Sequence, residues 1–176
     1  AYQFGDDGDN DQRAFAVSGE LGYSFDHDYK PRLSVSATYA SGDRKPLDEK
    51  SERFDRLFGA AHFWSSTDYF TWRNLISPKI RLELRPTEKL RLDSSYGGYW
   101  LASDSDAWPD IGRRDRAGRS GDFIGQEIDI RARYQLTKFA ELEVGYSHFL
   151  PGAFVGNTGP ADDSDFFYVQ TTIALQ

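Results

Sequence analysis

The chain has 176 residues and a mass of 20.0 kDa, a length that usually corresponds to one domain. Acidic residues outnumber basic ones by 28 to 21, so the chain lacks the excess of Lys and Arg that a general nucleic-acid binder needs. Cysteine is absent, which excludes disulfides, thiolate metal sites and cysteine nucleophiles. The mean hydropathy is −0.64, and no run approaches the roughly 20 apolar residues of a membrane helix. A transmembrane barrel remains compatible, because its strands show only one apolar face to lipid.

A two-residue alternation of apolar and polar side chains recurs along the chain and predicts β-strands. It is clearest in residues 122–136, where Ile128, Ile130 and Ala132 alternate with charged residues. A strand places the two sets on opposite faces, whereas a helix would scatter the charges around its axis. The alternation predicts seven complete strands and a short first one, in the order 1–4, 13–25, 32–40, 76–86, 90–101, 122–136, 140–150 and 165–175.

The connections between these strands alternate in length. Short turns are predicted at 26–31, 86–89 and 136–140, and long connections at 5–12, 41–74, 102–121 and 151–164. Outer-membrane barrels have short periplasmic turns and long extracellular loops. The strands also suit the roughly 9–11 residues that a tilted strand needs to cross a membrane. The predicted fold class is all-β, an antiparallel up-and-down transmembrane β-barrel with about eight strands in this chain and a periplasmic C-terminus.

A soluble antiparallel barrel or sandwich is the main alternative, because it alternates in the same way. Its apolar face would be the core and its charged face would meet water. Two features favour the membrane protein. Aromatic residues gather near the predicted strand ends, as in the girdles at membrane interfaces. The connections at 41–74 and 102–121 are also long for a compact soluble domain.

The polar face of the predicted strands would line the water path of a pore. It carries seven acidic residues, Glu20, Glu83, Asp93, Glu127, Asp129, Glu141 and Glu143. It also carries Arg32 and a further six basic residues, which we call the basic band: Lys79, Arg81, Arg85, Arg91, Arg131 and Arg133. The face is neutral in sum. The band nevertheless falls on three successive strands, which are neighbours in a meander.

Two interpretations of the basic band remain open. Arginine forks match the geometry of carboxylates, so the band could guide acidic solutes, with the inward-facing Tyr99 offering a surface to sugar rings. Alternatively, the band pairs with acids across strands. A hairpin centred near Thr137 would place Arg133 opposite Glu141 and Arg131 opposite Glu143. The hairpin at 86–89 allows either Arg85 or Glu83 opposite Arg91.

The long connection at 41–74 contains Phe54, Leu57 and Phe58 at helical spacing. This spacing is compatible with a short amphipathic helix over or in the pore. Packing of these aromatics on the barrel rim is the favoured interpretation.

Two other features of the sequence resemble functional sites. Asp7, Asp9 and Asp11 resemble the start of a calcium loop, but Gln12 and Ser18 stand where its Gly and Glu belong. His148 and Ser147 are adjacent in a strand and point to opposite faces, which disfavours a lipid hydrolase. We therefore expect neither an enzyme nor a cofactor.

Several segments resemble parts of the alginate export family of outer-membrane porins. They are YASGD, FDRLFG, NLISPKIRLELRP, YWLASDSDAW, GDFIGQEIDIRARYQL, ELEVGYSHFLPGAFV and DDSDFFYVQTTI. The resemblance covers nearly the whole chain and implies a larger barrel of about eighteen strands. No charged n-region followed by an apolar h-region is present. Residues 1–176 are therefore expected to be one barrel domain, the C-terminal portion of a longer porin.

The resemblance implies a Gram-negative outer-membrane export channel for an anionic polysaccharide or small acidic solutes, which pass by diffusion without a cofactor. The implied pore-lining residues are the basic band and Tyr99. The implied partners are outer-membrane lipid, the acidic solute and periplasmic export proteins, with no nucleic acid. The alternative is a small closed barrel that serves as an anchor or an adhesin through its long loops, since about eight strands can close on a filled interior.

Overall fold

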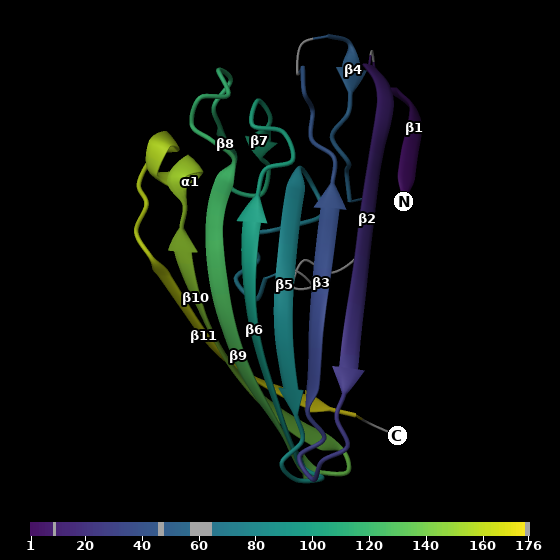
Figure 1. Ribbon diagram of the computed structural model, residues 1–176, viewed down its shortest axis with the longest axis vertical. Coiled ribbons are helices and arrows are strands. Elements are labelled where there is room, and N and C mark those ends of the chain that lie inside the picture. The colour runs from purple at the N-terminus through teal and green to yellow at the C-terminus, as the bar shows by residue number, and fades with distance from the viewer. Residues whose placement is uncertain (9, 46–47, 57–64, 175–176) are drawn as a thin grey trace.

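The computed structural model describes residues 1–8, 10–45, 48–56 and 65–174. Its main element is an antiparallel sheet of long strands lying side by side (Figure 1). In spatial order the strands are β1 (Tyr2–Asp7), β2 (Asn10–Ser24), β3 (Arg32–Ala40), β5 (Leu75–Leu84), β6 (Leu90–Trp100), β9 (Phe123–Thr137), β10 (Ala140–Pro151) and β11 (Ser164–Ile173). Consecutive strands are always neighbours, so the predicted all-β, up-and-down topology is confirmed.

Four short elements lie in the long connections. The strand β4 (Lys50–Ser51) pairs in parallel with β2, and β7 (Ala107–Trp108) forms a small hairpin with β8 (Arg113–Arg114). The helix α1 (Ala153–Thr158) follows β10. All of them lie at the end of the sheet opposite the short turns (Figure 1). In the described residues, no helix is long and apolar enough to cross a membrane.

The prediction of a long connection at 5–12 is wrong. Strand β1 continues to Asp7 and β2 begins at Asn10, and these two residues pair directly. Glycines make this local course possible, because Gly5 has φ 125° and Gly8 has φ 62°, values that other residues rarely adopt. The short first strand is therefore one arm of a hairpin.

The exposure of the two faces of the sheet is the reverse of that in a soluble sandwich, because here the apolar face is exposed and much of the polar face is buried. The apolar face, called the outer face, is exposed: Leu21 is 78% and Ile130 is 54% accessible. On the polar inner face, Glu127 is 1% and Ser147 is 0% accessible. A soluble sheet buries its apolar side, so this arrangement suits a wall that meets lipid on one face and water on the other.

The hydrophobic core lies between the long connections and the inner face. It is built from residues of the loops, of α1 and of the strands β2, β3, β5, β6, β9 and β10, which include Phe54, Phe70, Leu75, Tyr99, Leu101, Trp108, Ile124, Phe149, Phe154 and Val155. Figure 1 shows part of the 41–74 connection crossing behind the strands. The loops therefore fold inward over the polar face and leave the outer face uncovered.

Candidate functional site: the charged inner face

The basic band lies on neighbouring strands, as predicted. Strand β6 pairs with β5 on one side and with β9 on the other. The register aligns Arg81 with Ser95 and Asp129, and aligns Arg91 with Arg133. Arg85 directly follows β5, and its amide donates a hydrogen bond of 2.7 Å to the carbonyl of Tyr29.

The predicted register of the hairpin between β9 and β10 is wrong by two residues. Arg133 faces Glu143, and Arg131 faces Gly145. The cause is a tight turn in which Ala140 pairs with Thr137, followed by an irregularity between Ala140 and Glu141.

The register of the hairpin at 86–89 is decided in the same way. Glu83 faces Asp93, and Leu84 faces Leu92. The placement of Glu83 opposite Arg91 is therefore excluded.

Three members of the band are held by carboxylates. Arg133 lies 2.8 Å from Asp93, and Arg131 lies 3.5 Å from the same carboxylate. Both guanidinium groups also reach Glu143, at 3.9 and 4.0 Å. Lys79 lies 3.6 Å from Asp129. For these three residues, cross-strand pairing therefore describes the contacts. Arg131 reaches Glu143 as predicted, whereas Arg133 pairs with Asp93 and Glu143 in place of Glu141.

The other three members of the band differ from these. Arg81, Arg85 and Arg91 make no ion pair with any residue that the structure describes. Their guanidinium groups remain available for an anion on the inner face.

Tyr99 lies on the inner face, yet its ring is not available to a solute. It is 0% accessible and stacks on Phe70 with ring centroids 3.7 Å apart. The expectation that Tyr99 lines an open water path is therefore not met in this structure. The alternation of the strands does not predict that Phe70 covers Tyr99, because Phe70 belongs to a loop without a periodic pattern.

Residues 65–72, which we call the strap, supply this cover. Ser65 and Thr67 each donate a hydrogen bond of 2.9 Å to the carboxylate of Glu127 in β9. The Tyr69 hydroxyl lies 2.8 Å from that of Ser164 at the start of β11. The strap thus reaches from the beginning of β5 across the inner face to the edge strand.

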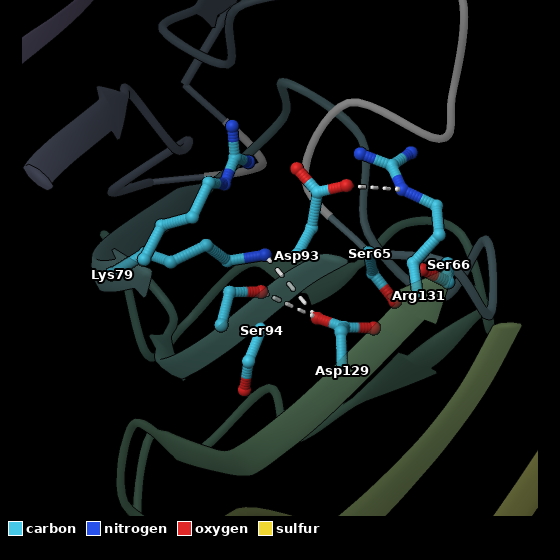
Figure 2. A pocket seen from close by; sticks show the side chains of 9 residues that line it. Ser65, Ser66, Lys79, Asp93, Ser94, Asp129 and Arg131 are labelled. Atoms are coloured by element: carbon cyan, nitrogen blue, oxygen red, sulfur yellow. Dashed lines mark hydrogen bonds and ion pairs between the residues drawn. The ribbon is translucent and has the colours of Figure 1, made fainter. Parts of the chain in front are cut away.

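A small cavity of about 60 Å³ lies between the strap and the sheet. Figure 2 shows the charged side chains of Lys79, Asp93, Asp129 and Arg131 around it. Ser65 and Ser66 of the strap form another part of its wall (Figure 2). Its polar lining and size suit one or two waters rather than a solute.

Leu57 and Phe58, which were expected to form a helix or to pack on the rim, lie outside the described residues. Phe54 is buried, with its ring centroid 5.4 Å from that of Trp72. This residue therefore packs within the loop core.

Asp106 joins two of the long connections. Its side chain is 0% accessible and accepts hydrogen bonds from Arg53 at 3.1 Å and Arg114 at 2.6 Å. The amides of Asp43 and Ala107 donate to the same carboxylate. One buried carboxylate therefore ties the 41–74 connection to the 102–121 connection.

Beside Asp106 lies an arginine-lined cleft of about 660 Å³. Its charged lining consists of Arg53, Arg73, Arg114 and Arg116. Asp55 pairs with Arg73, and Asp106 pairs with two others, whereas Arg116 makes no ion pair with described residues. The cleft is not predicted from charge, because the 41–74 and 102–121 connections each carry as many acidic as basic residues. The arginines at 113, 114 and 116 were the available signal.

Asp115 organises the turn that follows β8. The hydrogen bond from the Ser120 hydroxyl, followed by those from the amides of Ala117 and Arg119, lowers the pKa of Asp115 from 3.8 to about 2. A lowered pKa means that the carboxylate stabilises the folded turn above pH 4, and that this contribution is lost as the pH falls from about 4 to 2.

We therefore expect the Asp115 carboxyl carbon to titrate with a midpoint near 2 in an NMR experiment on selectively labelled protein. Ser120→Ala removes the largest cause and should move the midpoint upward. A wild-type midpoint near 4 would contradict this account of the turn.

Two further features were predicted from the sequence, the acidic run at 7–11 and the neighbouring residues Ser147 and His148. Asp9 of the acidic run lies outside the described residues, and no group of three or more metal-ligating side chains occurs within them. Ser147 donates to Asp129 at 2.6 Å, whereas His148 lies 2.8 Å from Asp165. The two side chains therefore have separate partners.

An antiparallel sheet with an exposed apolar face, a charged inner face and inward-folded loops defines the class of outer-membrane β-barrel proteins. The family model for alginate export matches residues 1–169. The chain belongs to the alginate export family, an outer-membrane family of polysaccharide export channels rather than of enzymes. No curated protein matches the chain.

Proposed function

We propose that the protein is a passive conduit for an anionic polysaccharide of the alginate type, or for smaller acidic solutes, across the outer membrane. The observation that carries this function is the set of three arginines, Arg81, Arg85 and Arg91, which have no ion pair among the described residues. A guanidinium that no protein carboxylate neutralises can bind the carboxylate of a passing solute in a bidentate way. No chemical step and no cofactor is part of this function.

The position of the free arginines supports transient rather than tight binding. Arg85 and Arg91 lie at the short-turn end of the sheet, and Arg81 lies nearer its middle. Charges exposed to water are screened beyond about 8–10 Å at physiological salt. Each contact is therefore weak enough to release the solute, as conduction requires.

The arginine-lined cleft places a second group of positively charged side chains at the other end of the sheet. Arg116 makes no ion pair there with the residues that the structure describes, and Arg53, Arg73 and Arg114 are neutralised only in part by two carboxylates. An acidic polymer would thus meet cationic groups near both ends of the inner face.

We propose further that residues 1–176 form one barrel domain within a larger barrel of about eighteen strands. Strands β1 and β11 are the two edges of the sheet and do not pair with each other in the described part of the chain. Lipid-exposed sheet edges do not occur within the hydrocarbon region, so further strands are expected to cover them.

The partners follow from this placement. Lipid would meet the exposed outer face, and periplasmic export proteins would meet the short turns.

Charge selectivity tests the function directly. In planar bilayers, the full-length protein should show anion selectivity by reversal potential across a salt gradient. Replacing Arg81, Arg85 and Arg91 together with Gln should lower the anion-to-cation permeability ratio about two- to threefold, because each charge contributes only about 0.2 kcal/mol after screening.

Arg13→Gln is the matched control, because Arg13 is exposed and pairs with Asp11 outside the band. It should leave the permeability ratio near that of the wild type. A cation-selective wild type, or a triple variant with an unchanged ratio, would leave the band with a structural role only. A wild type that does not conduct would favour the anchor or adhesin alternative.

A further inference from the structure

Glu127 stands apart from the other carboxylates of the inner face. It is 1% accessible, and no cation lies within ion-pair distance of it among the described residues. Its partners are hydroxyl groups: Ser65 and Thr67 donate to one oxygen at 2.9 Å, and Tyr99 donates to the other at 3.4 Å. A carboxylate so far from water is not placed to attract a solute cation.

Two of the three donors belong to the strap, so the carboxylate joins a loop to the wall of the sheet. A buried polar group that loses its hydrogen-bond partner carries the full cost of its desolvation, so these bonds are costly to remove. Ser65 is itself 2% accessible, so both ends of its bond to Glu127 are shielded from competing water. Glu127 therefore accepts two of the hydrogen bonds that attach the N-terminal half of the strap to the sheet.

The C-terminal half of the strap has its own attachments. The ring of Phe70, 1% accessible, lies on Tyr99, and the Trp108 indole donates 2.8 Å to the carbonyl of Tyr69. Thr71 donates to the Asp110 carboxylate through both its amide and its hydroxyl. Residues 65–67 meet the sheet through two carboxylates of β9, because Ser65 and Thr67 donate to Glu127 and Ser66 donates to Asp129.

The strap occupies space that would otherwise belong to the water path. Only a cavity of about 60 Å³ remains between it and the sheet, too small for a sugar ring. Figure 2 shows Ser65 and Ser66 close to the charged side chains of β5, β6 and β9. A solute must therefore pass on the far side of the strap.

We infer that Glu127 is a positioning residue that holds the strap against the inner face and thereby sets the width of the pore. This inference rests on the proposed function, since it describes the cross-section of the same conduit. The geometry assigns Glu127 to the control of size rather than of charge.

The decisive variant is the double substitution Ser65→Ala with Thr67→Ala. It removes both hydrogen bonds that the strap donates to Glu127 and leaves every charge of the sheet in place. In planar bilayers the full-length double variant should show a rise in single-channel conductance of roughly twofold, because the strap removes a layer about as thick as one strand spacing, near 5 Å, from one side of the path. Larger polyethylene glycols should enter the pore, while the anion-to-cation ratio should stay close to the wild-type value.

Two variants of the acceptor complete the series. Glu127→Ala should reproduce the increase in conductance, and Glu127→Gln should restore part of the wild-type value, because its amide oxygen still accepts a hydrogen bond. The matched control is Ser18→Ala with Thr38→Ala, which removes another serine–threonine pair, 2.8 Å apart on the inner face of β2 and β3 and away from the strap. It should conduct like the wild type.

The outcomes separate this inference from the function on which it rests. A wild type that does not conduct would overturn the proposed function. A conducting wild type whose Ser65→Ala/Thr67→Ala variant has the same conductance and the same polymer cut-off would overturn the role of Glu127 and leave the conduit intact. An increase seen with Glu127→Ala but absent in the double variant would trace the change to charge and would also overturn it. Folding of each variant is checked by the heat-dependent shift in gel mobility of the barrel.

Discussion

Asp106→Ala should loosen the long loops more than any other single substitution in them. Its carboxylate, 0% accessible, accepts from Arg53, Arg114 and two backbone amides. Removing one partner of a buried ion pair costs about 3–5 kcal/mol. Because Arg53 and Arg114 retain 39% and 28% of their side-chain exposure, we expect the low end, about 3 kcal/mol, as a loss of the free energy of local opening.

Hydrogen exchange measures this loss. The amides of Asp43 and Ala107 should exchange roughly a hundredfold faster in Asp106→Ala than in the wild type, while those of the strands keep their rates. Asp104→Ala is the matched control, because Asp104 lies in the same loop, is exposed and forms no hydrogen bond with described residues. Equal protection of these amides in Asp106→Ala and Asp104→Ala would contradict the role of Asp106 in joining the two long connections.

Ile130→Arg should destabilise the protein in a membrane by about 2–4 kcal/mol. Ile130 is 54% accessible on the outer face and is the central residue of β9. If the strand spans the bilayer, this position lies near the midplane, where a charged side chain is most costly. Denaturant unfolding of the protein from lipid vesicles, followed by tryptophan fluorescence, gives the change in the free energy of unfolding.

Ile111→Arg is the control, because Ile111 is 42% accessible in the loop between β7 and β8. It should change the free energy of unfolding by less than about 0.5 kcal/mol. Spin labels give a second measurement. Labels at Ile128, Ile130 and Ala132 should be quenched by a lipid-soluble reagent, and labels at Arg131 and Arg133 by a water-soluble one. Similar costs for both arginine variants, or equal quenching on both faces, would contradict a lipid-facing outer surface.

The sequence by itself determined the strands, their faces and their order. Alternation in a strand is a local property, since neighbouring side chains point to opposite sides whatever the partner strand does. Ile128 and Ile130 could therefore be assigned to one face and Asp129 and Arg131 to the other before any contact was known. The alternation of short turns and long connections likewise gave the topology, because antiparallel neighbours joined by tight turns leave few other arrangements.

The register and the inward fold of the loops were decided only by the tertiary structure. A hairpin register depends on the geometry of a few turn residues, and the irregularity at Ala140 moved Arg133 from Glu141 to Glu143. The 5–12 segment was misjudged because glycines at 5 and 8 permit a tight hairpin that composition alone does not distinguish from a loop.

The burial of Tyr99 and the joining of two loops by Asp106 depend on contacts between residues far apart in the chain. Examples are Phe70 with Tyr99 and Arg53 with Asp106. No periodic pattern encodes such contacts, because each loop residue takes its position from the surface on which the loop packs. The strands could therefore be predicted from local side-chain direction, whereas the contact between Glu127 and the strap, to which we assign control of the pore width, forms only in the folded chain.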